Sequence, residues 1–425
     1  MHPYLSHLEC PICHRHYRLE EVSYTCPTCG EAGTLDIVYD YERLRQDITP
    51  EQISAQTAPE SLNLWRYRPL LPVLDDAFIP PLHIGWTPLL RAPRLAAALE
   101  VKEIWLKDEG RNPTASLKDR ASAMVAARAA EIGAEVITTA SSGNAAAALA
   151  GVCASVGIRC VIFVPHTAPQ AKITQLLVYG ATVFLVKGTY DDAFDLSVQA
   201  AKEYGWYCRN TGMNPFTTEG KKTAAFEIAE QLGWTAPDVI LVSVGDGNII
   251  AGQYKGFYDL YQMGWIDRMP RLIGVQAEGS SSMVRAWAEE RDPVSMTVEP
   301  ATTVADSISV GLPRDRVKAM RAVRATNGSY LSVPDTAILA AIPELARAAG
   351  VFAEPAASTV LAGLHRALET GLVGHQERVA LLITGHGLKD IKSAIASVEA
   401  EGKIAHPVEP SMDGVRQLAK ELGLA

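Results

Sequence analysis

The chain has 425 residues, of which 48% are hydrophobic and 20% are charged, and its net charge is −9. This composition predicts a soluble globular protein with two or three domains, and the acidic balance argues against a nucleic-acid partner because phosphate backbones require a basic surface. No apolar run reaches the roughly 18 residues of a membrane span, and the first residues do not resemble a signal peptide. We therefore expect a cytoplasmic protein that acts on a small molecule.

Two pairs of closely spaced cysteines lie at the front of the chain, namely Cys10, Cys13, Cys26 and Cys29. Two C-x2-C knuckles separated by twelve residues suit a tetrahedral zinc ion, and four thiolate ligands leave no open position for a substrate. The alternatives are a redox pair or unrelated loop cysteines. We predict a structural zinc site in a zinc-ribbon-like module over residues 1–45.

From residue 100 onward, short β-branched apolar runs alternate with Ala-rich stretches. The predicted strands are 103–107, 135–140, 159–165, 182–187, 239–245, 271–278 and 378–385, and the predicted helices are 118–132, 143–156, 169–179, 190–204, 219–232, 248–262 and 335–349. This alternation predicts an α/β fold of parallel sheets with helices on both faces. In such sheets ligands bind at the carboxyl ends of the strands, so the loops there are candidate sites.

Three of these loops carry unusual residues. Ser141-Ser142-Gly143-Asn144 opens a helix with hydroxyl groups and backbone N–H groups that suit an anion such as a carboxylate, or it is a plain serine cap. The Gly-rich turn 245–249 suits a single phosphate, although a tight βα turn is the simpler alternative; its residues are Gly245, Asp246, Gly247, Asn248 and Ile249. Thr384 follows the last predicted strand and offers a hydroxyl, for example to a ring nitrogen.

Lys118 raises a separate question, because it is either a solvated surface charge or a reactive amine. It lies in the sequence NPTASLKDR, residues 112–120. Further motifs occur in chain order as GWTPL (85–89), SSGN (141–144), NPFTTEGKKT (214–223), VGDGN (244–248) and TGHGLKD (384–390). Together they resemble the motifs of the type II family of pyridoxal-phosphate enzymes, and within it those of the threonine synthases.

The resemblance implies the type II fold, with two doubly wound sheet domains. The small domain would span 112–215, inserted into a large cofactor-binding domain formed by 46–111 and 216–425. Lys118 would form the Schiff base and act as the general base, while Asn144 would bind the cofactor's 3-oxygen. Residues 245–249 would hold its phosphate, Thr384 its ring nitrogen, and Ser141, Ser142 and Gly143 the substrate carboxylate. Glu354 would line the far side of the ring, or it is a surface acid.

The implied reaction belongs to amino-acid biosynthesis and converts O-phospho-L-homoserine into L-threonine and phosphate, in a homodimer. One departure bears on the substrate: Thr217 stands where the family has an arginine for the substrate phosphate. Lys221, Lys222 or Arg314 would have to compensate. The alternatives are therefore an ammonia-lyase of a hydroxy or diamino acid, or a catalytically silent binding protein with this fold.

Overall fold

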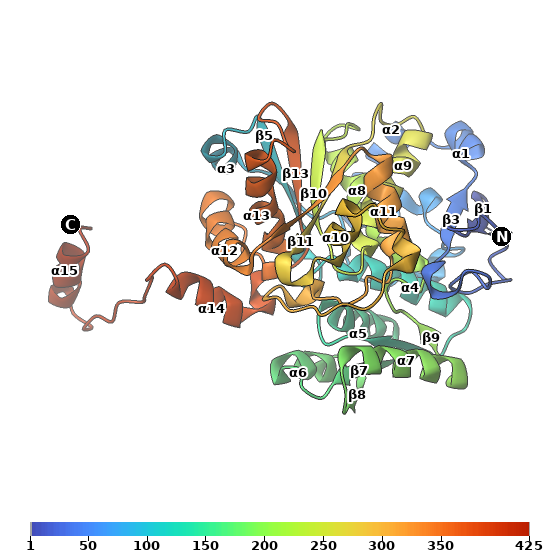
Figure 1. Ribbon diagram of the computed structural model, residues 1–425, viewed down its shortest axis with the longest axis horizontal. Coiled ribbons are helices and arrows are strands. Elements are labelled where there is room, and N and C mark those ends of the chain that lie inside the picture. Colours follow the sequence, from blue (N-terminus) through green and yellow to red (C-terminus); the bar gives the residue numbers. More distant parts are fainter. Residues whose placement is uncertain (1, 425) are drawn as a thin grey trace.

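The computed structural model describes residues 2–424 and shows a small front module packed against an α/β body (Figure 1). The module is an antiparallel sheet with the strand order β2-β1-β3, made of β1 (Leu5–Glu9), β2 (His16–Tyr17) and β3 (Asp36–Tyr39). Two short helices follow, α1 (Tyr41–Asp47) and α2 (Pro50–Ser54). Leu8 and Ile37 belong to the same apolar core as the helices of the body, so the module is not an independent unit.

The larger sheet has six strands in the order β12-β11-β10-β13-β5-β4. Only β4 runs antiparallel to its neighbour. Its strands are β4 (Leu89–Arg91), β5 (Glu103–Asp108), β10 (Val239–Ser243), β11 (Arg271–Ala277), β12 (Ser329–Val333) and β13 (Arg378–Ile383). The parallel strands β10, β11 and β13 are buried along nearly their whole length because both faces of the sheet are covered by helices, as parallel sheets require.

Successive side chains of these strands enter two different cores. Ile240 and Val242 pack with α8 (Phe216–Gln231), α9 (Asn248–Gln262) and α11 (Arg316–Ala325). Val239 and Leu241 pack on the other face, where the covering helices are α3 (Pro93–Ala98), α12 (Asp335–Ala349) and α13 (Pro355–Glu369). The period of two residues in a strand explains this division.

The smaller sheet has four parallel strands in the order β8-β7-β6-β9. These are β6 (Val136–Ala140), β7 (Arg159–Pro165), β8 (Thr182–Val186) and β9 (Tyr207–Cys208). α7 (Tyr190–Tyr204) packs on one face; the other helices of this layer are α4 (Lys118–Glu131), α5 (Asn144–Val156) and α6 (Gln170–Val178). Figure 1 shows this layer below the larger sheet, with α4 and α5 nearest to it.

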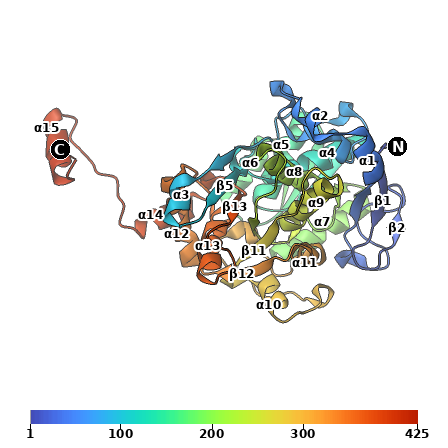
Figure 2. The same ribbon diagram turned by 90° about the horizontal axis from the view of Figure 1, so that it is seen from above.

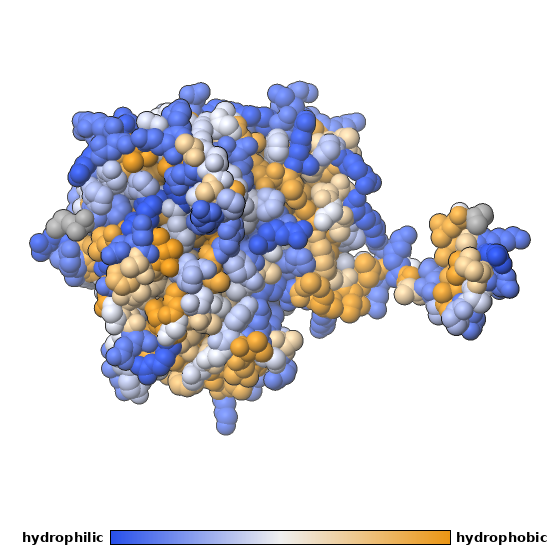
Figure 3. Space-filling model, turned by 180° about the vertical axis from the view of Figure 1, so that it is seen from behind, coloured by the Kyte–Doolittle hydropathy of each residue, from blue (hydrophilic) through white to orange (hydrophobic). Residues whose placement is uncertain are grey.

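The remaining helices are α10 (Ser282–Ala288), α14 (Ile391–Glu399) and α15 (Met412–Glu421). Figures 1 and 2 show α15 at the end of an extended segment that leads away from the body. Apolar residues gather on α14 and α15 (Figure 3), and the exposed ones include Ile391, Ile395, Met412 and Val415. Among residues 2–424, no helix is both long and apolar enough to span a bilayer.

The predicted α/β fold is confirmed, and 190–204, 248–262 and 335–349 are helices with the predicted bounds. Two strands end two residues earlier than predicted, at Ser243 and Ile383, because the residues that follow turn into the loops of the candidate site. The sequence analysis did not predict β9, β12, α11 or α13. β9 has two residues, too few for a periodic pattern to show.

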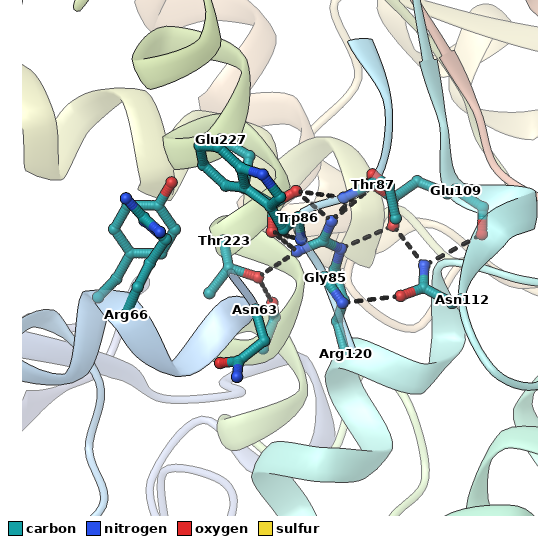
Figure 4. Close-up of polar contacts among 12 residues, drawn as sticks. Asn63, Arg66, Gly85, Trp86, Thr87, Glu109, Asn112, Arg120, Thr223 and Glu227 are labelled. Atoms are coloured by element: carbon teal, nitrogen blue, oxygen red, sulfur yellow. Dashed lines mark hydrogen bonds and ion pairs between the residues drawn. The ribbon is translucent and has the colours of Figure 1, made fainter. Parts of the chain in front are cut away.

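A buried ionic network joins α4 to the end of β5 and to α8 (Figure 4). The Arg120 guanidinium forms two forked contacts, with Nε and Nη2 donating to Glu109 at 2.6 and 2.8 Å and Nη1 and Nη2 donating to Glu227 at 2.6 and 2.7 Å. Glu227 also accepts from Lys107 at 2.6 Å and from the backbone N–H of Trp86 at 2.7 Å. Burial opposes the charge, yet Arg120 and Lys107 lower the pKa of Glu227 to about 2.

The network explains the residues of two motifs. Gly85 has φ +87°, and an added Cβ would lie 2.7 Å from Glu227 Oε1 and 2.8 Å from Leu64 N, so glycine is required there. Asn112 accepts from the Gly85 N–H at 3.0 Å and donates to Glu109 at 2.9 Å. These residues of GWTPL and NPTASLKDR fix the start of α4, where Lys118 lies.

Glu227→Gln keeps the shape of the side chain but removes the charge shared by Arg120 and Lys107. Breaking a buried ion pair leaves uncompensated charge, so we expect a loss of about 3–5 kcal/mol in the free energy of unfolding. Denaturant titration followed by circular dichroism measures this loss. Glu369→Gln, which removes an exposed partner of Arg366, is the matched control and should leave the midpoint unchanged. Equal midpoints for both variants would contradict the role of the network.

Candidate active site

A cavity of about 1230 Å³ lies at the carboxyl ends of strands from both sheets. Its wall includes the loops that follow β6, β7, β9 and β10. The predicted site residues on this wall are Lys118, Ser141, Ser142, Gly143, Asn144, Lys221, Gly245, Asp246, Gly247, Asn248 and Ile249. The fold thus brings together residues that are far apart in the sequence: Lys118 and Ile249 are separated by 131 positions. This position agrees with the general location of ligands in open α/β sheets.

Lys118 is the first residue of α4 and is partly exposed to the cavity. The loop before it is anchored to the end of β13: Leu117 N–H donates to the Thr384 carbonyl at 2.9 Å, and His386 N–H donates to the Ala115 carbonyl at 3.1 Å. Burial, followed by the charge of Arg209, lowers the pKa of Lys118 to about 8. Near neutral pH a substantial fraction of this amine is therefore uncharged and nucleophilic.

Asn144 lies at the start of α5 and donates to Glu354 Oε1 at 2.8 Å. Glu354 is 4% exposed, so the alternative of a surface acid is wrong. Burial raises the pKa of Glu354, although the bond from Asn144 and the charge of Lys118 act in the opposite direction. Gly385 permits this placement, because an added Cβ would lie 2.4 Å from Glu354 Oε1.

The Gly-rich turn leads from β10 into α9. Gly247 has φ +89°, and an added Cβ would come within 2.7 Å of the Ala319 Cβ. Asn248 begins α9, accepts from the Lys221 amine and donates to Thr218 at 2.8 Å and to Asp315. A helix N-terminus with nearby backbone N–H groups and an amine is a suitable environment for a phosphate.

Two of the residues considered for the substrate, Thr217 and Lys222, do not line the cavity. Thr217 is buried, its hydroxyl donates to the Asn214 carbonyl at 2.7 Å, and it does not belong to the cavity wall. Lys222 lies in an ionic cluster with Glu219 at 2.5 Å and Asp259 at 2.7 Å, again away from the wall. We therefore remove both from the candidate substrate residues. Thr384 is also buried behind the wall, next to the loop that precedes Lys118.

Arg209 and Tyr190 are among the wall residues that the sequence analysis missed. Arg209 follows β9 directly, and its N–H donates to the Thr138 carbonyl at 2.8 Å in the smaller sheet. Because β9 was not predicted, no pattern placed Arg209 at the end of a strand. Tyr190 is the first residue of α7, and its place in the predicted helix 190–204 could have indicated a position near the loops.

The four cysteines of the front module lie together. Their sulfur atoms are all within 4.8 Å of one another, and Cys13 Sγ is 3.7 Å from Cys26 Sγ. Zinc–sulfur bonds of about 2.3 Å at tetrahedral angles place two sulfur atoms about 3.8 Å apart. The arrangement therefore fits a zinc ion with four thiolate ligands.

Comparison with known proteins agrees with this geometry. The family described as pyridoxal-phosphate dependent enzyme matches residues 81–385. The chain belongs to this family. A threonine synthase of Methanocaldococcus jannaschii is 39% identical over 414 residues, which are 97% of this chain and 99% of that protein. A threonine synthase of Mycobacterium tuberculosis is 36% identical over 360 residues, covering 84% and 95% of the two chains.

Solved structures share the fold of these pyridoxal-phosphate dependent enzymes. Threonine deaminase isoform 2 from Solanum lycopersicum has a TM-score of 0.63 at 23% identity, over 75% of this chain and 88% of that chain. A fungal L-serine ammonia-lyase from Rhizomucor miehei has a TM-score of 0.65 at 20% identity, over 74% and 97%. At this level of identity the likeness supports the fold and not the reaction.

The lowered pKa of Lys118 predicts the pH dependence of cofactor attachment. Only the neutral amine attacks an aldehyde, so the rate at which the apoprotein binds pyridoxal phosphate covalently should rise through pH about 8 and level off above it. Stopped-flow absorbance on cofactor-free protein measures this rate. Lys118→Arg serves as the control and should show no covalent attachment at any pH. A rate that rises only near the ordinary lysine pKa would contradict the burial argument.

Proposed function

We propose that this chain converts O-phospho-L-homoserine into L-threonine and phosphate, by elimination of the phosphate followed by addition of water. The proposal rests on threonine synthases that match nearly the whole chain. The observation in the structure that supports it best is Lys118, an amine with a lowered pKa on the wall of a large cavity. The reaction is that of a pyridoxal-phosphate dependent carbon–oxygen lyase.

The wall residues fit pyridoxal phosphate. Among residues 2–424, Lys118 forms no ion pair, so its amine is free to bind an aldehyde. The close approach at Gly247 and the N-terminus of α9 leave backbone N–H groups for a phosphate, next to Lys221. Asn144 would hold the 3-oxygen of the ring. The wall does not include Thr384, so the predicted contact of its hydroxyl with the ring nitrogen is not supported by the cavity lining. When bound, the cofactor supplies an electron sink that lowers the cost of removing the substrate's α-proton.

Residues of the chain would bind the substrate and transfer its protons. Ser141, Ser142 and Gly143 present hydroxyl and N–H groups at the wall, which would hold the substrate carboxylate. Lys118 would take the proton from the α-carbon as a general base and return a proton at a neighbouring carbon. Its lowered pKa suits both directions of transfer, because the neutral and charged amines are both populated near neutral pH. Glu354, held by Asn144, would lie beside the ring, and burial raises the pKa of its carboxyl.

Purified protein should release phosphate and threonine from O-phospho-L-homoserine in equal amounts. Lys118→Ala should abolish turnover and the absorbance of the lysine-bound cofactor, because no other residue can replace the amine. Phosphate release and amino-acid analysis follow the reaction, and Lys392→Ala, a change in another wall lysine, is a comparison for the loss of a charge alone. Normal turnover in Lys118→Ala would disprove the assignment.

The ammonia-lyase remains the second candidate, and one observation favours it: Thr217 replaces the arginine expected for the substrate phosphate and lies behind the wall. Fold neighbours include an L-serine ammonia-lyase, which supports this candidate only as family context. If the protein releases an oxo acid from serine, threonine or diaminopropionate and no phosphate from O-phospho-L-homoserine, this reading replaces the first. Absence of any turnover with bound cofactor would favour the silent binding protein.

We also propose that Cys10, Cys13, Cys26 and Cys29 hold a structural zinc ion. Removal of the metal should increase hydrogen exchange in residues 1–45, because four ligands that tie two knuckles together are lost, while the bound cofactor should remain. Metal analysis, hydrogen exchange and cofactor absorbance before and after chelation measure the effect. Cys26→Ser should reproduce it, whereas Cys160→Ser, in the core of the smaller sheet, should not alter the metal content. A metal-free module with unchanged exchange would contradict the proposal.

A further inference from the structure

Arg209 has an environment unlike that of the buried residues Arg120 and Arg66. It is 0% exposed, it borders the cavity, and its Nη2 has no hydrogen-bond partner. Its other contacts are to hydroxyl groups: Nη1 donates to Thr211 at 2.8 Å and Nε donates to Ser122 at 3.3 Å. In the part of the chain that the structure describes, no carboxylate lies within ion-pair distance of this guanidinium.

Two other buried arginines have carboxylate partners, which Arg209 lacks. Arg120 has two carboxylate partners, and Arg66 forms a forked pair with Glu230 at 2.6 and 3.1 Å. Burial lowers the pKa of Arg209 to about 10, so the group still carries its charge at neutral pH. A buried charge without a counter-ion is unfavourable, and such a group is retained where a ligand supplies the missing partner.

We propose that Arg209 binds the phosphate group of the substrate, in place of the arginine that this chain lacks at Thr217. The proposal rests on the proposed function. The guanidinium supplies a planar pair of donors, of which Nη2 is free, and a phosphate accepts such donors in a forked geometry.

The positions in the smaller sheet suit the length of the substrate. β6 and β9 are neighbours, and Ser141 follows β6 as Arg209 follows β9. Neighbouring strands lie about 4.8 Å apart, and the carboxylate carbon and the phosphorus of O-phospho-L-homoserine are about 6 Å apart in an extended chain. A substrate whose carboxylate lies against Ser141–Gly143 therefore extends its phosphate toward the end of β9.

Two other cations of the wall, Lys221 and Arg314, have partners that direct them elsewhere. Lys221 donates to Asn248 at the N-terminus of α9, on the side that suits the cofactor phosphate. Arg314 pairs with Asp191 at 3.2 Å and lies over the Phe194 ring. Arg209 is the wall arginine with a free donor and no acidic partner.

The decisive measurement is the affinity of the cofactor-loaded protein for an unreactive analogue of the substrate, in which a methylene group replaces the ester oxygen of the phosphate. Isothermal titration should show that Arg209→Gln lowers this affinity by roughly 100-fold, because a charge-assisted fork is lost. The affinity for L-norvaline, which has no phosphonate, should change less than about threefold. The phosphonate affinity of Arg209→Lys, which keeps the charge but not the fork, should lie between the affinities of the wild type and of Arg209→Gln.

Four other outcomes would contradict the inference about Arg209 or the proposed function. If the wild-type protein does not bind the phosphonate, the proposed function is wrong. If the wild-type protein binds it and Arg209→Gln binds it equally well, only the inference about Arg209 is wrong. Loss of affinity in Arg314→Gln and not in Arg209→Gln would assign the phosphate to Arg314. Weaker binding of pyridoxal phosphate with normal phosphonate affinity would assign Arg209 to the cofactor.

Thermal unfolding separates a binding role from a structural one. Removal of a buried unpaired charge should leave the melting temperature of Arg209→Gln unchanged or higher, and the analogue should stabilise the variant less than it stabilises the wild type. A lower melting temperature together with normal analogue affinity would show that Arg209 is structural. Arg347→Gln, at an exposed pair with Glu401, is the matched control for the loss of one arginine. If Arg209→Gln does not fold, Arg209→Lys carries the comparison.

Discussion

The contact on which the active-site arrangement depends is the double fork of Arg120 between Glu109 and Glu227. Arg120 is two residues after Lys118 on α4, and the two carboxylates come from the end of β5 and from α8. The network therefore ties the helix that carries Lys118 to the larger sheet and to the helix that carries Lys221. Removing water from these charges makes the geometry rigid, because a displaced partner would leave a buried charge unpaired.

Much of the fold followed from the alternation of apolar runs, and the loops at strand ends were the correct place to look for a site. The pattern could not place individual residues of α8, however. Every residue from Phe216 to Ala229 is buried, so this helix has no polar face to indicate which side chains point toward the cavity. Lys221 and Lys222 looked equivalent in the sequence, yet one lies on the cavity wall and the other in an ionic cluster beside the front module.

The local charge of the cavity also could not be predicted from composition. The chain as a whole has a net charge of −9, but Lys118, Arg209 and Lys221 lie on one wall. Burial lowers the pKa of both lysines; the charge of Arg209 lowers the pKa of Lys118 further, and the charges of Lys118 and Arg209 lower that of Lys221 further. Asp246 offsets part of this charge, although burial raises the pKa of its carboxyl. Whole-chain charge bears on nonspecific partners, whereas a recessed wall sets its own preference for anions.

The front module also contacts the rest of the chain through side chains other than its four cysteines. Tyr24 accepts from the Cys208 N–H at 2.9 Å, next to Arg209, and Asp36 pairs with Lys318 at 3.1 Å and with Arg321 at 2.5 Å on α11. A chain shortened to begin at residue 46 would therefore lose counter-ions for two partly or fully buried cations as well as its four clustered cysteines. Without the front module, the rest of the chain would need new counter-ions for Lys318 and Arg321 and a new hydrogen-bond partner for the segment that carries Arg209.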